Sequence, residues 1–221
     1  VTKEETPEVY DTFMEYTTKA YASEKSPLEL SFIPIHPGDI LSYGGYHFEV
    51  KLLKGHTFGQ CGLYEPEKKL MFVGDQLMTT IVPIVGTQET DLGMLKCYLD
   101  SLGDLKHNYK DCYFLPCHYG EIRNVEKEVN RIILGYLEKC EIMKHVLEEA
   151  GTALTTRDIG VRTYGRSQGP PDYAHFASCT YIWAKTFSCM EYMMGEGFVE
   201  RSERDGIIYW KAPSIHFENN R

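Results

Sequence analysis

The sequence predicts a layered α/β fold of the α+β kind, followed by a small α-rich domain. Two observations lead to this prediction. Short apolar runs alternate with turn residues in the first part of the chain, and the apolar period becomes helical after about residue 124. A chain of 221 residues with 43% hydrophobic and 13% aromatic residues is long and apolar enough to bury a core. We therefore expect a globular protein.

The first part of the chain is expected to form an antiparallel meander. It opens with an amphipathic helix predicted over residues 7–22. The strand-like runs that follow are separated by turn residues, Gly44-Gly45 at one turn and residues 65–68 at another. These runs are residues 40–43, 46–53, 61–64 and 70–73.

A helix and one more strand are predicted to complete this part. The helix covers about residues 91–105 behind a cap at Thr90 or Asp91, and the strand covers residues 112–115. Strands, then a helix, then a strand are the order of one half of a layered α/β domain.

The tail of the chain shows the order of a winged helix. A long helix is expected from residue 124 to Gly151. A capping box at residues 155–158 starts a short helix, and a longer helix covers residues 173–195. A hairpin centred on Arg204-Asp205-Gly206 ends the pattern. We place the two domains at residues 1–121 and 122–221.

Charge and composition exclude several classes of protein. The net charge is −9, with −8 in residues 1–121 (10 Lys/Arg, 18 Asp/Glu) and −1 in residues 122–221 (13 and 14). This balance is untypical of a protein that coats nucleic acid, and the acidic part is compatible with a cation site. Seven cysteines without a CxxC pair fit neither a disulfide framework nor a zinc knuckle. Without an apolar run of about eighteen residues, we expect a cytoplasmic protein that does not enter a membrane.

Three side chains follow predicted strands at positions where their ligand atoms can meet. His56 lies in a Gly-rich turn, Asp75 follows Gly74 at a strand end, and His118 follows another apolar run. Loops at strand ends commonly carry the residues of a site. Imidazole and carboxylate groups together suit zinc, iron or manganese. The sequence therefore predicts a metal site that uses His56, Asp75 and His118.

These motifs resemble the later motifs of the metallo-β-lactamase superfamily, which read GHTxG, then GD, then GHG or a variant. The order, the spacing and the intervening helix agree over residues 38–120, and the tail looks like the winged-helix extension of one branch of the superfamily. The resemblance implies the second half of an αββα sandwich. It also implies a site for two zinc ions, with iron or manganese as alternatives, in which His56 ligates one ion, His118 ligates the other and Asp75 bridges them.

The sequence also departs from the superfamily pattern. Phe58 and Gln60 stand where the superfamily often has Pro and a second His, and Cys117 replaces a Gly. The HxHxDH motif, which supplies the other ligands, is absent. The chain is then either a piece of a longer protein or a degenerate homologue. We favour a piece, because the missing motif would precede Val1 and the chain has no initiator Met. We expect an exposed apolar sheet face that binds the missing N-terminal half or a second copy of the chain.

The predicted function is metal-dependent hydrolysis of an ester, a thioester or a phosphodiester by a metal-activated water. Its substrate would be a small-molecule ester or thioester, or RNA, and no catalytic residue beyond the ligands is assigned. With so few ligands, this chain alone is expected to hold metal weakly or not at all, and to be a poor catalyst.

Two alternatives remain open at the level of the sequence. The chain is either a nucleic-acid-binding winged-helix module or an interaction subunit with a vestigial metal site. The arginines of the tail form either a nucleic-acid face or an ordinary solvated surface. They are Arg157, Arg162, Arg166, Arg201 and Arg204. The histidines outside the motifs are expected to be structural or surface residues. They are His36, His47, His107, His145 and His175.

Overall fold

The computed structural model describes residues 33–85, 93–165 and 173–213, together with Asp11 and Glu15. The helix predicted over residues 7–22 lies outside the described residues, except for Asp11 and Glu15, which are helical. The described chain forms two compact units, one over residues 33–137 and one over residues 138–213. They divide within a long helix, whereas the sequence places the domain boundary before it, after residue 121.

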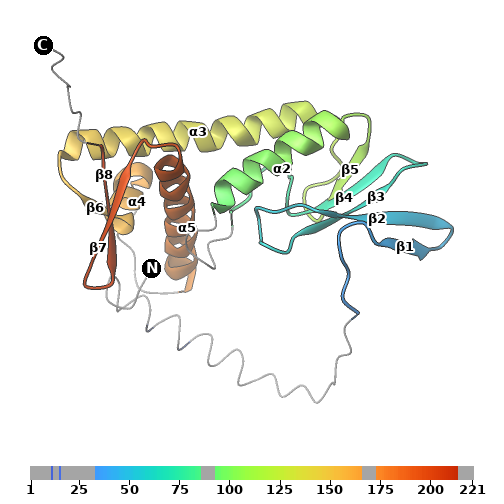
Figure 1. Ribbon diagram of the computed structural model, residues 1–221, viewed down its shortest axis with the longest axis horizontal. Helices are drawn as coiled ribbons and strands as arrows, with labels where there is room; N and C mark the ends of the chain where they lie inside the picture. The colour runs from blue at the N-terminus through green and yellow to red at the C-terminus, as the bar shows by residue number, and fades with distance from the viewer. Residues whose placement is uncertain (1–10, 12–14, 16–32, 86–92, 166–172, 214–221) are drawn as a thin grey trace, which may run out of the picture. The chain divides into compact units, whose positions relative to one another are not determined.

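The first unit contains a five-stranded sheet with the order β1-β2-β3-β4-β5 (Figure 1). Neighbouring strands from β1 to β4 are antiparallel, and β5 pairs with β4 in parallel. The strands are β1 (Ile40–Tyr43), β2 (Tyr46–Leu52), β3 (Cys61–Glu65), β4 (Leu70–Gly74) and β5 (Tyr113–Pro116). The predicted meander and the final strand are therefore confirmed, with ends that differ by one residue.

Turn chemistry explains the register of the meander. Gly44 and Gly45 join β1 to β2 with φ values of 57° and 82°, which glycine adopts without a steric penalty. The next hairpin closes when the Glu65 carboxylate accepts a hydrogen bond from the backbone N–H of Lys68. Lys69 then takes a φ of 52° before β4 begins. Both turns come from short polar segments that the sequence identifies.

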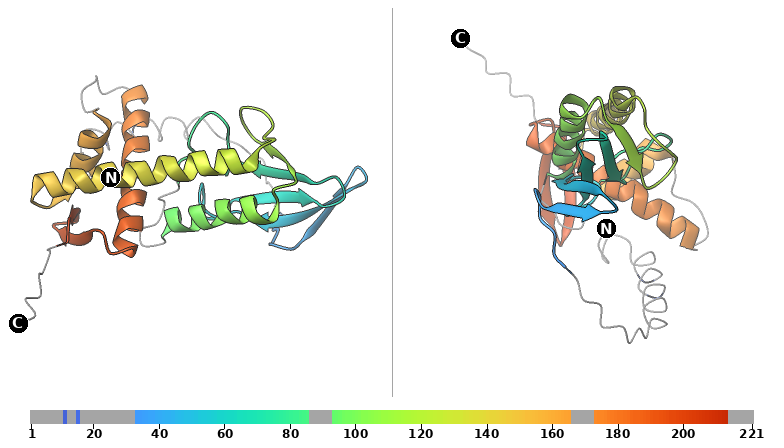
Figure 2. Two further views of the ribbon diagram at one scale, coloured as in Figure 1. Left: turned by 90° about the horizontal axis from the view of Figure 1, so that it is seen from above. Right: turned by 90° about the vertical axis from the view of Figure 1, so that its right-hand side faces the viewer.

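Helix α2 (Met94–Asn108) covers one face of the sheet, together with the part of helix α3 (Val125–Ala150) that precedes residue 138 (Figure 2). The two helices contact each other through Lys106 Nζ, which donates to Asn130 Oδ1 at 2.9 Å. The rings of Tyr98 and Tyr136 also meet edge to face, with centroids 5.9 Å apart. This helix layer buries the inner face of the sheet.

The predicted cap of α2 is wrong. The helix begins at Met94, and its cap is Gly93 in the left-handed region, with no side-chain hydrogen bond. The predicted caps, Thr90 and Asp91, lie outside the described residues. Glycine is tolerated at a helix start because it costs little there compared with a poor cap.

The two faces of the sheet differ in exposure. Met71 and Val73 are fully buried toward the helices, whereas Phe72 between them is 40% exposed. Alternate residues of a strand point to opposite faces, so Phe72 lies on the other face of the sheet. The register places Leu63 and Leu115 beside it on neighbouring strands. An apolar row therefore crosses the face opposite the helices.

The second unit joins helices to a three-stranded sheet with the order β6-β8-β7. Its elements after α3 are β6 (Leu154–Thr155), α4 (Thr156–Tyr164), α5 (Tyr173–Gly195), β7 (Glu200–Arg204) and β8 (Ile207–Lys211). The capping box is present, because Thr155 Oγ1 accepts from Asp158 N and the Asp158 carboxylate accepts from Thr155 N. The hairpin turn is also as expected, with positive φ at Asp205 and Gly206. The order matches the predicted tail with β6 added, and the winged-helix interpretation stays a prediction.

Trp210 anchors the core of the second unit. Its side chain is fully buried, and its Nε1–H donates to Thr156 Oγ1 at 2.9 Å. The ring of Phe187 packs against it edge to face. These contacts join α4 and α5 to β8.

Across the described ranges, no helix combines the length and the apolar character that a membrane crossing needs.

We predict that Thr156→Val destabilises the second unit by ~1–3 kcal/mol, because it leaves the buried Trp210 N–H without its acceptor. Thr163→Val in the same helix is the matched control, since the buried Thr163 Oγ1 has no hydrogen-bond partner among the described residues. This control should change the free energy of unfolding by no more than ~0.5 kcal/mol. Urea unfolding followed by tryptophan fluorescence measures both, because Trp183 and Trp210 lie in this unit. Equal losses for the two variants would contradict the assignment.

Candidate metal centre

The loop between β2 and β3 carries His56 and packs tightly against α2. Gly55 in this loop has a φ of 146°, and a Cβ there would lie 2.3 Å from Tyr98 Cδ2 and 2.7 Å from Tyr98 Cα. Only glycine permits this approach, because the Tyr98 backbone is fixed within the helix. The close packing at Gly55 holds His56 at the end of the sheet.

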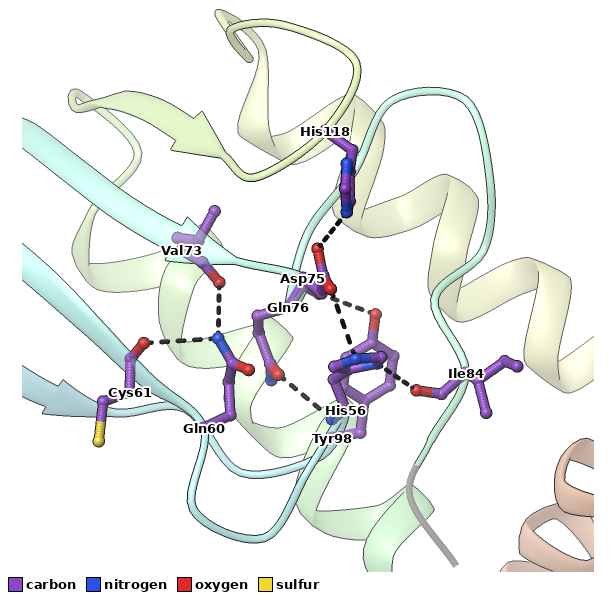
Figure 3. Close-up of polar contacts among 9 residues, drawn as sticks. All are labelled: His56, Gln60, Cys61, Val73, Asp75, Gln76, Ile84, Tyr98 and His118. Carbon is purple, nitrogen blue, oxygen red and sulfur yellow. Dashed lines mark hydrogen bonds and ion pairs between the residues drawn. The ribbon is translucent and has the colours of Figure 1, made fainter. Parts of the chain in front are cut away.

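The hydrogen bonds of His56 define which ring nitrogen can ligate. His56 Nδ1 lies 2.8 Å from the carbonyl oxygen of Ile84. A carbonyl can only accept, so Nδ1 carries the proton and, in the neutral ring, Nε2 keeps its lone pair. Nε2 faces Asp75 Oδ2 at 3.6 Å. The ring therefore presents a potential ligand atom to Asp75 (Figure 3).

Gln76 links this loop to β4 and α2. Its side chain is fully buried. Its Nε2 donates to Lys54 O and to Ser101 Oγ, both at 3.0 Å, and its Oε1 accepts weakly from His56 N at 3.4 Å. Tyr98 Oη donates to Gln76 O at 2.8 Å, and burial raises the pKa of Tyr98 well above its usual value. Tyr98 therefore remains a neutral donor.

Asp75 follows the last residue of β4. Gly74 before it has a φ of 56°, and a Cβ there would lie 2.3 Å from Gln60 Nε2. Gln60 Nε2 occupies this space to donate to Val73 O at 3.3 Å. The Asp75 side chain is 30% exposed, but its Oδ1 is buried and has no hydrogen-bond partner among the described residues. The carboxylate thus has an unsatisfied acceptor inside the protein.

His118 reaches the same carboxylate from the segment after β5. Cys117 N donates to Gly74 O at 3.2 Å, which ties this segment to the end of β4. The chain then turns through Tyr119, with a φ of 70°. His118 Nε2 lies 3.5 Å from Asp75 Oδ1, and its side chain is 62% exposed.

The three residues that the sequence selects are therefore brought together as two pairs that share one carboxylate. Each imidazole faces a different oxygen of Asp75, at 3.6 Å for His56 and 3.5 Å for His118. These separations exceed those of hydrogen bonds. They are close to those of two atoms that each lie ~2.0–2.2 Å from one metal ion. Within the described residues, no three His, Cys, Asp or Glu side chains surround a single point.

The histidines outside the motifs lie elsewhere in the described chain. His47 shares a hydrogen bond with Ser42, and His145 forms ion pairs with Glu148 and Glu149. The side chain of His175 lies outside the described residues. Cys117 is exposed. Its backbone N–H donates to the carbonyl of Gly74 at the end of β4.

Sequence reasoning missed the groups that orient His56. Gln76 gave a weak signal, as a polar residue directly before the apolar Leu77-Met78 pair. The carbonyl of Ile84 gave none, because every residue has one and only the fold selects it.

Comparisons with known proteins give similarity at the level of the fold. No family model matches the chain. A metallo-beta-lactamase family protein from Thermus thermophilus aligns with a TM-score of 0.69, 21% identity, 91% of this chain and 65% of that one. A Beta-lactamase domain protein from Burkholderia ambifaria aligns with a TM-score of 0.73, 18% identity, 93% of this chain and 59% of that one. The chain has the metallo-β-lactamase fold. The fold that the motifs imply is thereby confirmed.

The structural similarity extends beyond the first unit. The first unit is about half of the chain, so coverage of 91% includes much of the second unit as well. This chain in turn spans less than two thirds of the length of either solved structure. Hydroxyacylglutathione hydrolase GloC of Haemophilus influenzae is 50% identical over 40 residues, which are 18% of this chain and 19% of that protein.

We predict that Gly55→Ala destabilises the first unit by ~2–4 kcal/mol, because the new methyl group overlaps Tyr98 and the φ is unfavourable. Gly59→Ala in the same loop is the matched control, since a Cβ there meets no atom within 4 Å. Its effect should stay within ~0.5 kcal/mol. Hydrogen exchange of the amides in β2 to β4 reads out this unit, because both tryptophans lie in the other one. Similar protection in both variants would show that the close contact with Tyr98 is not required.

Proposed function

We propose that this chain supplies one part of a dinuclear metal centre in a hydrolase. His56 would ligate one ion, His118 the other, and Asp75 would bridge them. The supporting observation is the Asp75 carboxylate, whose two oxygens each face a different imidazole. A carboxylate held in this way between two imidazole nitrogens has the arrangement of a bridging ligand.

The unsatisfied oxygen of Asp75 supports the presence of cations. A buried carboxylate oxygen without a hydrogen bond is costly. A metal ion beside Oδ1 would remove this cost and would contact His118 Nε2 as well. The donor set of two imidazoles and one carboxylate suits zinc, and iron or manganese are alternatives. The described residues supply two donors to each ion, and a catalytic zinc ion takes at least three protein ligands. Further ligands would have to come from the HxHxDH half of the fold.

Metal ions held here would lower the pKa of a bound water and polarise the substrate carbonyl. The residues of this chain would hold the ions and orient the groups that ligate them. The Ile84 carbonyl keeps the proton of His56 on Nδ1, so that Nε2 stays available. Asp75 would offer one carboxylate oxygen to each ion. His118 is 62% exposed in this chain, which leaves its imidazole accessible to an ion.

We propose a thioester as the substrate class. The relative from Haemophilus influenzae is named as a hydrolase of hydroxyacylglutathione, which is a thioester. The charge of the chain also favours a small substrate over RNA, because residues 1–121 carry a net charge of −8 and would repel a polyanion.

The nucleic-acid alternative receives less support from the second unit. The guanidinium of Arg201 lies over the ring of Trp210 at 6.0 Å, and that of Arg204 over the ring of Tyr209 at 5.2 Å. Lys211 Nζ pairs with Glu200 at 2.8 Å. These cations of the hairpin are engaged by groups of the same hairpin, which is typical of an ordinary solvated surface. Arg166 lies outside the described residues.

We predict that the chain binds Zn²⁺ or Co²⁺ weakly at two half-sites, one formed by His56 and Asp75 and the other by His118 and Asp75. Single substitutions should distinguish the two. His56→Ala and His118→Ala should each weaken one class of site, and Asp75→Asn should weaken both, by ~10–100-fold. Isothermal titration calorimetry and the visible spectrum of bound Co²⁺ measure these changes. His145→Ala is the control, because His145 is an exposed histidine of the second unit. An unchanged affinity in Asp75→Asn would remove the bridging role.

We also predict that thioester hydrolysis requires the HxHxDH half of the fold. The chain alone should turn over an acyl-glutathione thioester poorly, and addition of a separately produced polypeptide with that half should restore activity. His56→Ala should abolish the restored activity, whereas His145→Ala should not. Rapid turnover by the chain alone would contradict the need for a second half. Cleavage of an oligonucleotide in place of the thioester would overturn the substrate class.

A further inference from the structure

The segment from Leu77 to Val85 carries the carbonyl that orients His56, and its two ends are fixed by burial. Leu77 and Val85 are fully buried, and Met78 is 3% exposed. The middle is less buried, since Ile81 is 44% exposed. The position of the Ile84 carbonyl therefore depends on what holds this middle part.

Helix α3 holds it through two side chains. Arg131 Nη2 donates to Met78 O at 2.6 Å and to Ile81 O at 3.3 Å. Tyr136 Oη donates to Pro83 O at 2.6 Å. Three carbonyls of one short segment thus receive their hydrogen bonds from one helix. Backbone carbonyls outside regular structure need such donors when they are withdrawn from water.

Both side chains of α3 are themselves held in place. Arg131 Nε donates to Glu128 Oε2 at 2.8 Å, and the Glu128 side chain is 11% exposed. Tyr136 is 2% exposed and meets the ring of Tyr98 edge to face. Tyr98 in turn donates to the carbonyl of Gln76, one residue before the segment. The two tyrosines thus hold the chain on either side of the segment's middle.

We propose that Tyr136 and Arg131 are positioning residues that set the tautomer of His56. Pro83 and Ile84 are consecutive, so the bond from Tyr136 to Pro83 O fixes the peptide directly before the Ile84 carbonyl. That carbonyl lies 2.8 Å from His56 Nδ1 and keeps the proton there. If the carbonyl moves away, the proton can shift to Nε2, which then donates to Asp75 and cannot ligate a metal ion. The importance of this tautomer for ligation rests on the proposed function, but the control of the tautomer does not.

The test compares Tyr136→Phe with Ile132→Val. Phenylalanine keeps the ring packing and removes the hydrogen bond to Pro83 O. Ile132 is a fully buried residue of the same helix, and its shortening gives a comparable loss of stability without removing a hydrogen bond from the segment. The ¹⁵N chemical shifts of the histidine rings, measured on the metal-free chain at one fixed pH at which the rings are neutral, report each tautomer. His56→Gln and His118→Gln assign the signals.

We expect the Nδ1–H tautomer at His56 in the unsubstituted chain and in Ile132→Val. In Tyr136→Phe the population of the Nε2–H tautomer should rise several-fold, with His118 unchanged, and Co²⁺ affinity at the His56 half-site should fall ~10-fold. An unchanged His56 tautomer in Tyr136→Phe would overturn the proposal. Arg131→Met, at a side chain that is 32% exposed, gives the same readout if Tyr136→Phe does not fold. A shifted tautomer in Tyr136→Phe, together with no hydrolysis by the unsubstituted chain after addition of the HxHxDH half, would support the positioning role and contradict the proposed function instead.

Discussion

The convergence of three chain segments on the Asp75 carboxylate is the constraint on which the candidate site depends. The carboxylate oxygens can face His56 and His118 only because three separate segments end at the same edge of the sheet. Gly74 allows the chain to turn at the end of β4, and the parallel pairing of β4 with β5 delivers His118 to the same edge. The sheet topology therefore places side chains from distant parts of the sequence within a few ångströms of one another.

The helix layer supplies the polar groups that the loops lack. Tyr98 of α2 and Tyr136 of α3 are almost fully buried, yet each donates to a backbone carbonyl beside the site. Burial raises the pKa of Tyr98, which keeps the phenol protonated. An apolar residue at either position would leave a carbonyl without a donor. The two helices thus hold irregular backbone in one conformation, besides covering the sheet.

The sequence predicts those features whose causes are local. The Gly44-Gly45 turn, the capping box at Thr155 and the hairpin turn at Asp205 are each determined by neighbouring residues, and each is found as expected. The cap of α2 was misplaced, because several polar residues precede that helix. The two-residue strand β6 was missed, because two residues show no period. The roles of Gln76, Ile84 and Tyr136 depend on contacts over 20 or more residues, which no local pattern encodes. The selection of His56, Asp75 and His118 came from motif order, and their function as ligands stays a prediction.

Charge links metal binding to completion of the centre. Two divalent ions bring about four positive charges, whereas the ligands proposed here are two imidazoles and one carboxylate. The net charge of −8 over residues 1–121 lowers the electrostatic free energy of holding two cations close together. Salt screens such surface charges over about 10 Å, so this contribution is small. Tight binding therefore needs additional anionic ligands close to the ions. A segment that provides them would be bound through the metals as well as through the apolar row at Phe72, so that each contribution strengthens the other. The weak metal affinity expected for the isolated chain and the activity expected after addition of the other half are then two measures of the same coupling.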